Sequence, residues 1–200
     1  MTEGFIHRPD RLDRAAQAAL LQAVFTAIRG AGFYQPTMPR TGRPLSVQMT
    51  NLGPLGWISD ARGYRYEPRH PETGAPWGSI PPILIDLWFE LGGYPHPPDA
   101  CLVNWYQAGS KLGLHVDQDE EDLNAPVVSV SLGDPARFRL GGLQRSDPTR
   151  TLKLNSGDVV ALTGPARRCF HGVDRIYAGG STLVPQGGRI NLTLRRARRP

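Results

Sequence analysis

Cysteines are scarce in this sequence, and a long apolar run is absent. Only Cys101 and Cys169 occur among 200 residues, and their spacing matches neither a CxxC pair nor a zinc finger. This excludes a disulfide framework and a cysteine-built zinc site, so any metal must bind histidine and carboxylate ligands. The longest apolar run, residues 18–28, is interrupted by Gln22 and Thr26 and is too short to span a bilayer. Because the first residues lack a signal-peptide pattern, we expect a cytoplasmic protein without a membrane partner.

Lysine is the second scarce residue. Of 23 basic residues only Lys111 and Lys153 are lysines, while the formal net charge is +5 and the pI about 9.6. A basic balance suits a polyanionic partner such as nucleic acid, but an arginine bias of this kind also follows from a GC-rich genome. The length and the 40% apolar fraction are typical of one globular domain. We therefore expect a single domain over residues 1–200, acting as a monomer.

Two amphipathic helices are predicted before residue 100. Residues 10–29 carry apolar side chains at helical spacing, after a candidate cap at Asp10 and before Gly30. Residues 81–91 begin with prolines and end before a pair of glycines, as helices commonly do. Between these helices, residues 36–78 are rich in proline, glycine and arginine and have poor periodicity. This stretch is predicted to be a long loop or hairpin layer.

From residue 100 onward the pattern changes to short β runs separated by turn chemistry. Eight such runs after two helices predict a mainly β protein with flanking α-helices. The expected architecture is a double-sheet jelly roll, with a core over residues 100–196 that is backed by the N-terminal helices. The runs are CLVNWY, LGLHVD, VVSVSLG, RFRLGGL, TLKL, DVVALTG, RCFHGV and RINLTLR.

A candidate metal site begins in the stretch LGLHVDQDE. Residues i and i+2 of a strand point to the same face, so His115 and Asp117 would both reach one ion. His171 lies in another predicted strand about fifty residues later, where a jelly roll can return the chain to the same place. Two imidazoles and one carboxylate form the facial triad of non-haem Fe(II) oxygenases. The pattern does not show that the three side chains converge, so a solvated hairpin end is the alternative.

The run at 189–195 alternates between apolar and polar residues, with Arg189 and Arg195 at the ends of its polar face. It is either an edge strand with solvated arginines or a site for a buried acidic ligand, because guanidinium binds carboxylate through two parallel hydrogen bonds. The two arginines lie about 20 Å apart in an extended strand, so their roles must differ. Asn104 and Tyr106 share one face of the CLVNWY run and either complete a small pocket or are routine core polar groups.

Together these motifs resemble the AlkB family of Fe(II)- and 2-oxoglutarate-dependent dioxygenases. The resemblance rests on HxD at 115–117, the distant His171 and RxNxTxR at 189–195. It runs through MTNLGPLGW, NWYQAGSKLGLHVDQDE, VSVSLGDPARFRLGGLQRSDP and RINLTLR. HxD with a distant histidine is shared by many 2-oxoglutarate oxygenases. RxNxTxR and GGLQRSDP in this order are more specific.

The resemblance implies a double-stranded β-helix that binds Fe(II), 2-oxoglutarate and dioxygen. It implies Fe(II) on the catalytic residues His115, Asp117 and His171, with 2-oxoglutarate chelating the iron. The far carboxylate of 2-oxoglutarate would be held by Arg189, Asn191, Asn104 and Tyr106. Arg195 would lie nearer the iron and orient Asp117 as a partner of that ligand.

The implied activity is direct repair of alkylated nucleic acid. A methyl group on a base nitrogen is hydroxylated and released as formaldehyde, while 2-oxoglutarate is decarboxylated to succinate. The implied substrates are the cationic bases 1-methyladenine and 3-methylcytosine in single- or double-stranded DNA, with RNA as a further target. Such an enzyme must extrude the base and hold it by stacking.

The resemblance also implies substrate-binding residues and makes residues 36–78 a nucleotide-recognition lid. Trp57 would stack on the base and Tyr64 would contact the phosphate backbone, although both aromatics would equally suit packing of the lid. Asp119 would favour a cationic ring, or it is an ordinary member of the acidic run. Arg145 would lie at the substrate mouth.

Two other functions fit parts of the sequence. The first is a 2-oxoglutarate oxygenase acting on a protein or a small molecule, which the aromatic and arginine-rich stretch over residues 36–78 argues against. The second is a basic nucleic-acid-binding or cupin-like module without catalysis, which requires one of the three candidate ligands to be misplaced. Convergence of those ligands is therefore the observation that separates an enzyme from a binding module.

Overall fold

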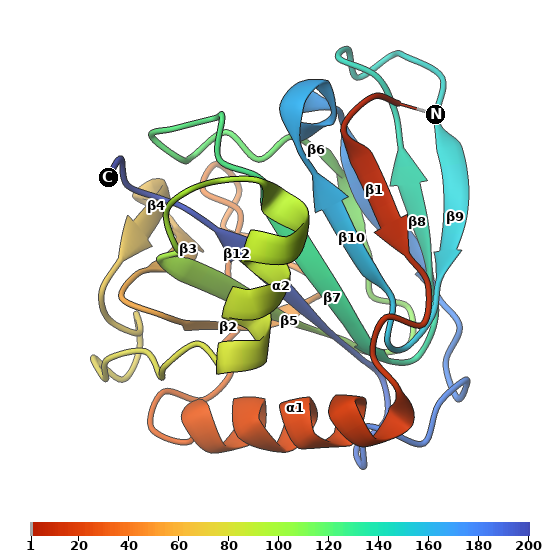
Figure 1. The fold of residues 1–200 in the computed structure, drawn as a ribbon. Coiled ribbons are helices and arrows are strands. Elements are labelled where there is room, and N and C mark those ends of the chain that lie inside the picture. The colour runs from red at the N-terminus through yellow and green to blue at the C-terminus, as the bar shows by residue number, and fades with distance from the viewer. Residues whose placement is uncertain (1) are drawn as a thin grey trace.

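The computed structural model describes residues 2–200, and most of its strands form two antiparallel sheets packed against each other (Figure 1). The large sheet contains, in order, β1 (Phe5–Arg8), β10 (Val159–Leu162), β7 (Val127–Gly133), β12 (Arg189–Arg195), β5 (Ala100–Tyr106) and β2 (Gln48–Leu52). The small sheet contains β6 (Leu112–His115), β11 (His171–Ile176), β8 (Ala136–Leu140) and β9 (Arg150–Leu154). This arrangement confirms the predicted mainly β, jelly-roll fold.

Two helices, α1 (Arg14–Ala27) and α2 (Pro82–Gly92), cover the outer face of the large sheet (Figure 1). The apolar stripes of both helices pack on the outward side chains of β5, β7, β10 and β12, and Trp88 is fully buried among them. The predicted Asp10 cap is wrong: Asp13 caps α1 by accepting a hydrogen bond from the Ala16 amide. Asp10 instead has a positive φ of 49°, and its amide donates to Asp158, so the chain turns there before the helix begins.

The strands of the large sheet separate two kinds of side chain. On β12 the apolar residues Ile190, Leu192 and Leu194 face the helices, as the alternation predicts. Residues of the other parity face the space between the two sheets, where a second apolar cluster includes Leu102 and Phe138. Side chains from both sheets therefore surround the interior of the jelly roll.

One predicted strand is shorter than the sequence pattern suggests. β6 ends at His115, so Asp117 does not share a strand face with it, and the i, i+2 argument for this pair is wrong. Asp119 cannot share that parity either, because the chain after His115 runs as an irregular segment to residue 126. The position of Asp117 therefore depends on tertiary contacts.

Residues 36–78 are not uniform. β2 lies within them and forms one edge of the large sheet, next to β5. β3 (Gly56–Asp60) and β4 (Gly63–Glu67) form a separate two-stranded hairpin that contacts β2 and β5 (Figure 1). β1, from before α1, forms the opposite edge of the sheet. Among the described residues, no helix has the length and apolar character needed to cross a membrane.

Candidate iron and cosubstrate site

A pocket opens between the two sheets, and its space amounts to about 600 Å³ when the open solvent at its mouth is included. Its apolar walls come from both sheets, including Leu112, Val127 and Phe138. Its lining includes seven of the predicted site residues: Asn104, Tyr106, His115, His171, Arg189, Asn191 and Arg195. The fold thus brings together residues that are spread over some ninety positions of the chain.

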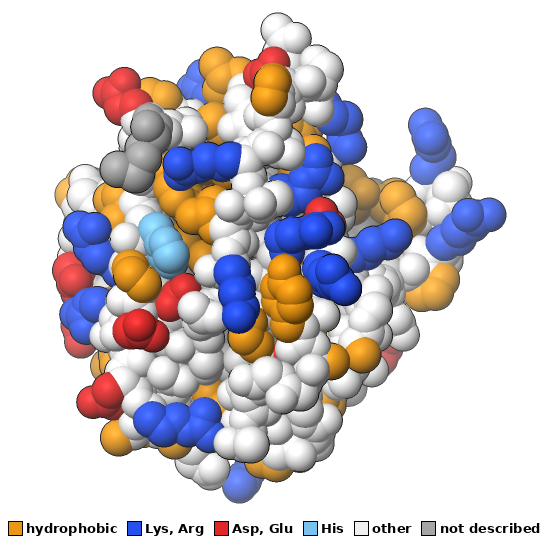
Figure 2. Space-filling model, turned by 90° about the vertical axis from the view of Figure 1, so that its right-hand side faces the viewer, with side chains coloured by type: hydrophobic (Ala, Val, Ile, Leu, Met, Phe, Trp, Pro, Cys, Tyr) orange, Lys and Arg blue, Asp and Glu red, His pale blue; other side chains and the backbone are white. Residues whose placement is uncertain are grey.

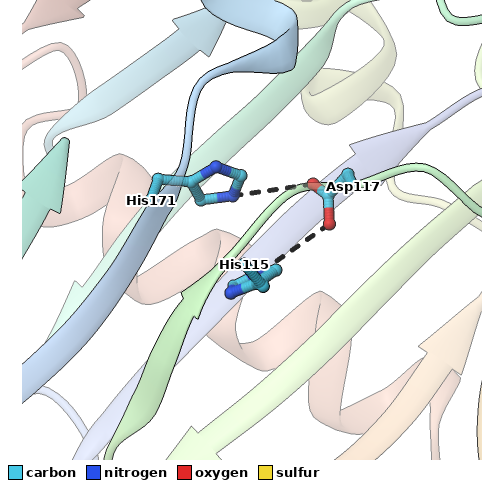
Figure 3. Close-up of side chains that lie close together, drawn as sticks. All are labelled: His115, Asp117 and His171. Atoms are coloured by element: carbon cyan, nitrogen blue, oxygen red, sulfur yellow. Dashed lines mark ion pairs between the residues drawn. The ribbon is translucent and has the colours of Figure 1, made fainter. Parts of the chain in front are cut away.

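The three candidate metal ligands converge at this pocket (Figure 3). His115 and His171 are cross-strand partners on β6 and β11, with ring centroids 4.6 Å apart. Each histidine Nε2 lies 3.7 Å from a carboxylate oxygen of Asp117, His115 from Oδ1 and His171 from Oδ2. One ligand atom from each residue lies within 4.8 Å of the others. This convergence argues against the solvated hairpin end.

Backbone carbonyls set the tautomer of both imidazoles. His115 Nδ1 lies 2.8 Å from the carbonyl oxygen of Gly113, and His171 Nδ1 lies 3.1 Å from that of Cys169. A carbonyl only accepts, so each Nδ1 carries a hydrogen, and each Nε2, which faces Asp117, is the ring atom available to a metal. Burial, followed by the neighbouring His115, lowers the pKa of His171 to about 4. His171 is therefore a neutral donor near neutral pH.

Asp117 is buried and held from two sides. Arg195 Nη2 donates to Asp117 Oδ1 at 2.8 Å, and Arg167 Nη1 donates to its backbone oxygen at 2.6 Å. Burial alone would raise the pKa of this carboxyl, but Arg195 and then the two histidines outweigh it and hold the pKa well below its usual range. Asp117 Oδ2 has no hydrogen-bond partner within residues 2–200.

This donor set fits a divalent iron ion. A buried carboxylate oxygen without a hydrogen-bond partner is costly unless a cation or a donor satisfies it. Two imidazole nitrogens and one carboxylate form the set that non-haem Fe(II) sites use, and they leave coordination positions for further ligands. Arg195 and the two carbonyl contacts orient these donors, as partners of metal ligands commonly do.

At the other end of β12, Arg189 is buried in the same pocket. It is 1% exposed, and its contacts include Ser131 Oγ at 2.7 Å from Nη2 and the Asp134 carbonyl at 3.3 Å from Nη1. No carboxylate within residues 2–200 forms an ion pair with Arg189, and its Nε has no partner. Burial lowers its pKa to about 10, because neighbouring charges compensate only partly. A buried, incompletely compensated guanidinium is suited to an anionic ligand.

The other predicted cosubstrate residues surround this end of the pocket. Burial raises the pKa of Tyr106 to about 12, so its phenol remains a hydrogen-bond donor. Asn104 is buried, and its Oδ1 has no partner among the residues that the structure describes. Asn191 already donates to Ser129 Oγ at 2.8 Å, so its amide is partly engaged by the sheet itself.

Two predicted substrate residues, Trp57 and Tyr64, lie on the β3–β4 hairpin, and Asp119 and Arg145 lie on loops. Trp57 and Tyr64 stack, with ring centroids 5.4 Å apart and an interplanar angle of 18°, and Tyr64 is 50% exposed. The Trp57 Nε1 donates to Asp119 Oδ2 at 2.8 Å, a contact that was not predicted. The guanidinium of exposed Arg145 lies 5.5 Å from the centroid of the Phe170 ring.

Three site residues were missed at the level of sequence. Glu120 and Arg167 form a buried ion pair of 2.9 Å behind Asp117, and Tyr66 donates to Glu120. Glu120 was hidden in the acidic run DQDEED, and Arg167 is one of two adjacent arginines before His171. No local pattern distinguishes them from solvated charges, because their burial depends on contacts between distant segments.

The chain is similar in sequence and fold to known 2-oxoglutarate-dependent oxygenases. The family model described as the 2OG-Fe(II) oxygenase superfamily matches residues 4–195. The chain is 59% identical to an alpha-ketoglutarate-dependent dioxygenase AlkB homolog of Caulobacter vibrioides over 98% of this chain and 88% of that protein. It is 48% identical to alpha-ketoglutarate-dependent dioxygenase AlkB of Escherichia coli over 78% of this chain and 74% of that protein. The structure of OsALKBH1 superposes with a TM-score of 0.84 at 32% identity, over 98% of each chain.

Two more distant relatives are named for an activity on nucleic acid. A DNA N(6)-methyladenine demethylase of Arabidopsis thaliana is 37% identical over 64% of this chain and 39% of that protein. A tRNA demethylase of Schizosaccharomyces pombe is 42% identical over 67% of this chain and 46% of that protein. The family model and the two AlkB relatives show that this protein belongs to the AlkB family of Fe(II)- and 2-oxoglutarate-dependent dioxygenases, with Fe(II) as cofactor and 2-oxoglutarate as cosubstrate.

Proposed function

We propose that the protein removes methyl groups from base nitrogens of DNA, and also of RNA, with 1-methyladenine and 3-methylcytosine as substrates. One observation carries this proposal. The hydrogen bond from Trp57 to Asp119 holds a flat aromatic side chain against a residue that follows the candidate ligand Asp117 by two positions. An aromatic face beside a metal site suits a planar base that has left its helix. The relatives named as DNA and tRNA demethylases support the same class of substrate.

In this proposal His115, Asp117 and His171 are the iron ligands and the catalytic residues. When bound, Fe(II) with 2-oxoglutarate and dioxygen supplies the oxidation of a methyl C–H bond. The residues around it keep the ligands in the correct state: Gly113 and Cys169 fix the imidazole tautomers through their carbonyls. Arg195 orients the carboxylate of Asp117 through the 2.8 Å hydrogen bond.

Arg189 binds the far carboxylate of 2-oxoglutarate, together with Tyr106, Asn104 and Asn191. The buried guanidinium supplies the charge, and the phenol of Tyr106 and the amides supply hydrogen bonds. Arg189 and Arg195 divide the work because they stand at opposite ends of β12, one remote from the metal ligands and one beside Asp117. The pocket between them is lined by both sheets and has an arginine at each end, which suits the two acidic groups of a dicarboxylate.

The substrate base is bound from the side of residues 36–78, which serve as a nucleotide-recognition lid. Trp57 stacks on the base, Tyr64 contacts the adjoining backbone, and Arg145 lies at the mouth. Asp119 stabilises the positive charge of the methylated ring through its carboxylate. Hydroxylation of the N-methyl group yields an N-hydroxymethyl base, which releases formaldehyde and restores the unmodified base. One atom of dioxygen thereby ends in formaldehyde and the other in succinate, while 2-oxoglutarate also loses carbon dioxide.

The basic surface supports contacts with a phosphate backbone. Lys and Arg side chains are spread over the face seen from the side of β8 and β9 (Figure 2). Arg150, Lys153 and Arg175 of the small sheet are exposed, and so is Arg145. Cations on one face raise the affinity for nucleic acid without reading its sequence.

The protein is further proposed to act as a cytoplasmic monomer with one domain over residues 1–200. The candidate site supports the monomer, because a single chain supplies all of its ligands and pocket walls. Nucleic acid as substrate supports a location inside the cell. Residues 100–196 form the jelly-roll core of this domain, completed at the sheet edges by β1 and β2.

The experiment that tests the function combines anaerobically iron-loaded protein, 2-oxoglutarate, air and a short oligonucleotide with one 1-methyladenine. Mass spectrometry follows replacement of the methyl group by hydrogen, and succinate and formaldehyde are measured alongside. We expect demethylation with one succinate per formaldehyde, and no demethylation with the His171→Ala variant. Succinate without demethylation would overturn the nucleic-acid substrate and favour a protein or small-molecule target.

A further inference from the structure

The hairpin that carries Trp57 is joined to the metal-ligand segment at two neighbouring points. Trp57 on β3 pairs directly with Tyr66 on β4. Trp57 donates to Asp119, while Tyr66 donates to Glu120, the next residue, with an oxygen–oxygen distance of 2.5 Å. A cross-strand pair on the hairpin therefore donates hydrogen bonds to two consecutive carboxylates.

Tyr66 is anchored as well as bonded. Its ring is buried with Ala100 and Ala197, and Leu55 and Trp57 pack against the same small cluster. Burial raises the pKa of Tyr66 well above its usual value, so the phenol stays a donor. Its hydroxyl is thus a fixed connection between the hairpin and the interior, whereas exposed Tyr64 on the same strand is free at its outer side.

Glu120 is linked to Asp117 through two arginines that contact both residues. Its side chain is 2% exposed, and Oε2 accepts a hydrogen bond of 2.9 Å from Arg167 Nη2. Arg167 also donates to the backbone oxygen of Asp117, and Arg195, whose Nε lies 3.6 Å from Glu120 Oε1, donates to the Asp117 carboxylate. Two carboxylates and two guanidinium groups form a balanced buried network, in which no member moves without disturbing the others.

This network decides where Asp117 lies. β6 ends at His115, so no strand ladder holds Asp117, and both hydrogen bonds to it come from arginines that contact Glu120. A shift of the hairpin changes the Tyr66–Glu120 contact and thereby the support of the metal ligand. Residues that orient metal ligands typically alter metal affinity or activity by about 10–100-fold when they are changed.

We propose that Tyr66 and Glu120 are positioning residues that couple base binding on the Trp57 hairpin to the geometry of the iron ligand Asp117. The inference rests on the proposed function, since it takes the hairpin to be the surface that receives the base. The coupling makes productive oxygen chemistry depend on an occupied lid. The competing account is that the network only stabilises the loop after β6, in which case its loss lowers stability without changing how cosubstrate and substrate turnover are linked.

Tyr66→Phe tests the coupling, because it removes one hydroxyl and retains the buried ring. Tyr94→Phe is the matched control: Tyr94 donates a 2.8 Å hydrogen bond to the carboxylate of Asp122, which belongs to no part of the proposed site. Both variants and the wild type are compared for thermal midpoint, anaerobic Fe(II) affinity, and succinate formed per formaldehyde released with the methylated oligonucleotide. Ascorbate is supplied as the reductant for turnovers that do not oxidise the substrate.

We expect Tyr66→Phe to weaken Fe(II) binding by about tenfold and to raise the succinate-to-formaldehyde ratio, while Tyr94→Phe matches the wild type in both. Oligonucleotide affinity should stay within about twofold, because Trp57 is retained. If Tyr66→Phe demethylates with the wild-type ratio and the wild-type iron affinity, the coupling is overturned even where its thermal midpoint falls. Wild-type protein that releases no formaldehyde would instead overturn the proposed function.

Glu120→Gln extends the test to the next member of the network. The variant retains the shape of Glu120 but leaves Arg167 and Arg195 with less negative charge around them. We expect a larger loss of iron affinity than in Tyr66→Phe. Soluble, folded Glu120→Gln protein with unchanged iron affinity and turnover ratio would contradict the proposal, and Tyr66→Phe decides it should Glu120→Gln fail to fold.

Discussion

The indole nitrogen of Trp57 donates a 2.8 Å hydrogen bond to Oδ2 of Asp119. The bond links the hairpin to the segment that carries Asp117, two residues earlier in the chain. It also fixes the plane of the Trp57 ring, whose stacking partner on one side is Tyr64. Asp119 therefore has two roles that mutation can separate: orientation of the indole through an oxygen acceptor, and stabilisation of a cationic base through its charge.

Asp119→Asn should separate these roles, because asparagine retains an acceptor oxygen for the indole and loses the negative charge. We expect turnover of an oligonucleotide with cationic 1-methyladenine to fall about tenfold, while the dissociation constant of 2-oxoglutarate stays unchanged. Asp119→Ala, which also removes the acceptor, should lower turnover further. Steady-state demethylation and 2-oxoglutarate titration measure the two effects. Equal loss of both in Asp119→Asn would contradict a role in charge recognition.

Trp57→Ala should weaken oligonucleotide binding, since base stacking on an aromatic side chain contributes about 1–3 kcal/mol per base. The corresponding rise in the dissociation constant is about 5- to 150-fold. Trp57→Phe retains a smaller aromatic face, so its oligonucleotide affinity should lie between those of the wild type and Trp57→Ala. Fluorescence anisotropy with labelled, methylated oligonucleotide measures the affinity, and a thermal scan shows whether the variants fold. Should Trp57→Ala unfold the protein and Trp57→Phe bind normally, the indole is a packing residue.

Arg189→Met should abolish tight binding of 2-oxoglutarate. Removal of one partner from a buried pair of guanidinium and carboxylate costs about 2–5 kcal/mol of binding free energy. We expect a loss of about 100-fold or more in affinity and loss of the 2-oxoglutarate-dependent rise in thermal midpoint. Arg137→Met is the control: Arg137 forms its ion pair with Asp174 on the outside of the small sheet.

Arg195→Met should act mainly on iron, since Arg195 donates to Asp117. The anaerobic Fe(II) affinity is therefore expected to fall by about 10–100-fold in this variant. Titrations of both ligands with both arginine variants test the division of roles along β12. Unchanged 2-oxoglutarate affinity in Arg189→Met, with complete loss in Arg195→Met, would mean that the two roles are reversed.

His171 predicts a pH dependence of the stability of the metal-free protein. Its pKa in the folded state is lowered to about 4, so the unfolded state, with a usual value of about 6.5, binds more protons between these limits. The contribution of His171 to stability is therefore fully present above about pH 6.5 and is lost as the pH falls toward about 4. Down to about pH 5 the loss amounts to about 2 kcal/mol.

Urea unfolding of metal-free wild type and His171→Gln at about pH 7.5 and about pH 5 measures this loss. The wild type should lose more stability between these pH values than the variant, which has no group to protonate at this position. Titrating groups remote from His171 contribute to both proteins and cancel in the comparison, whereas Asp117 and His115 respond to its replacement. An equal loss in wild type and variant would show that His171 is not a buried neutral imidazole.

The polar face of β12 was predictable from the sequence. Arg189, Asn191 and Arg195 alternate with three apolar residues, and the structure places the two sets on opposite faces of the large sheet. Alternation is a local property of an extended chain, because successive side chains point to opposite faces whatever the surroundings. The same reason made the fold class and the inward placement of Asn104 and Tyr106 predictable.

The structure brings the three candidate metal ligands together, but not for the reason that the sequence suggested. His115 and Asp117 were expected on one strand face, but β6 ends at His115 and Asp117 follows outside the strand. Strand ends depend on which neighbours pair with them, and here β11 pairs with β6 only up to His115. The carboxylate reaches the histidines because Arg195 and Arg167 hold it there.

By itself, the sequence determined the periodicity of the helices and strands and the scarcity of cysteine, and it indicated candidate metal ligands and a polar face at β12. These features rest on residue type and on spacing along the chain. Only the tertiary structure decided that Glu120 is a buried partner of Arg167 and Tyr66, which lie 47 and 54 residues away in the sequence. A carboxylate has the same local signature in solvent and in a buried network; the packing of distant segments around it decides which of the two it joins.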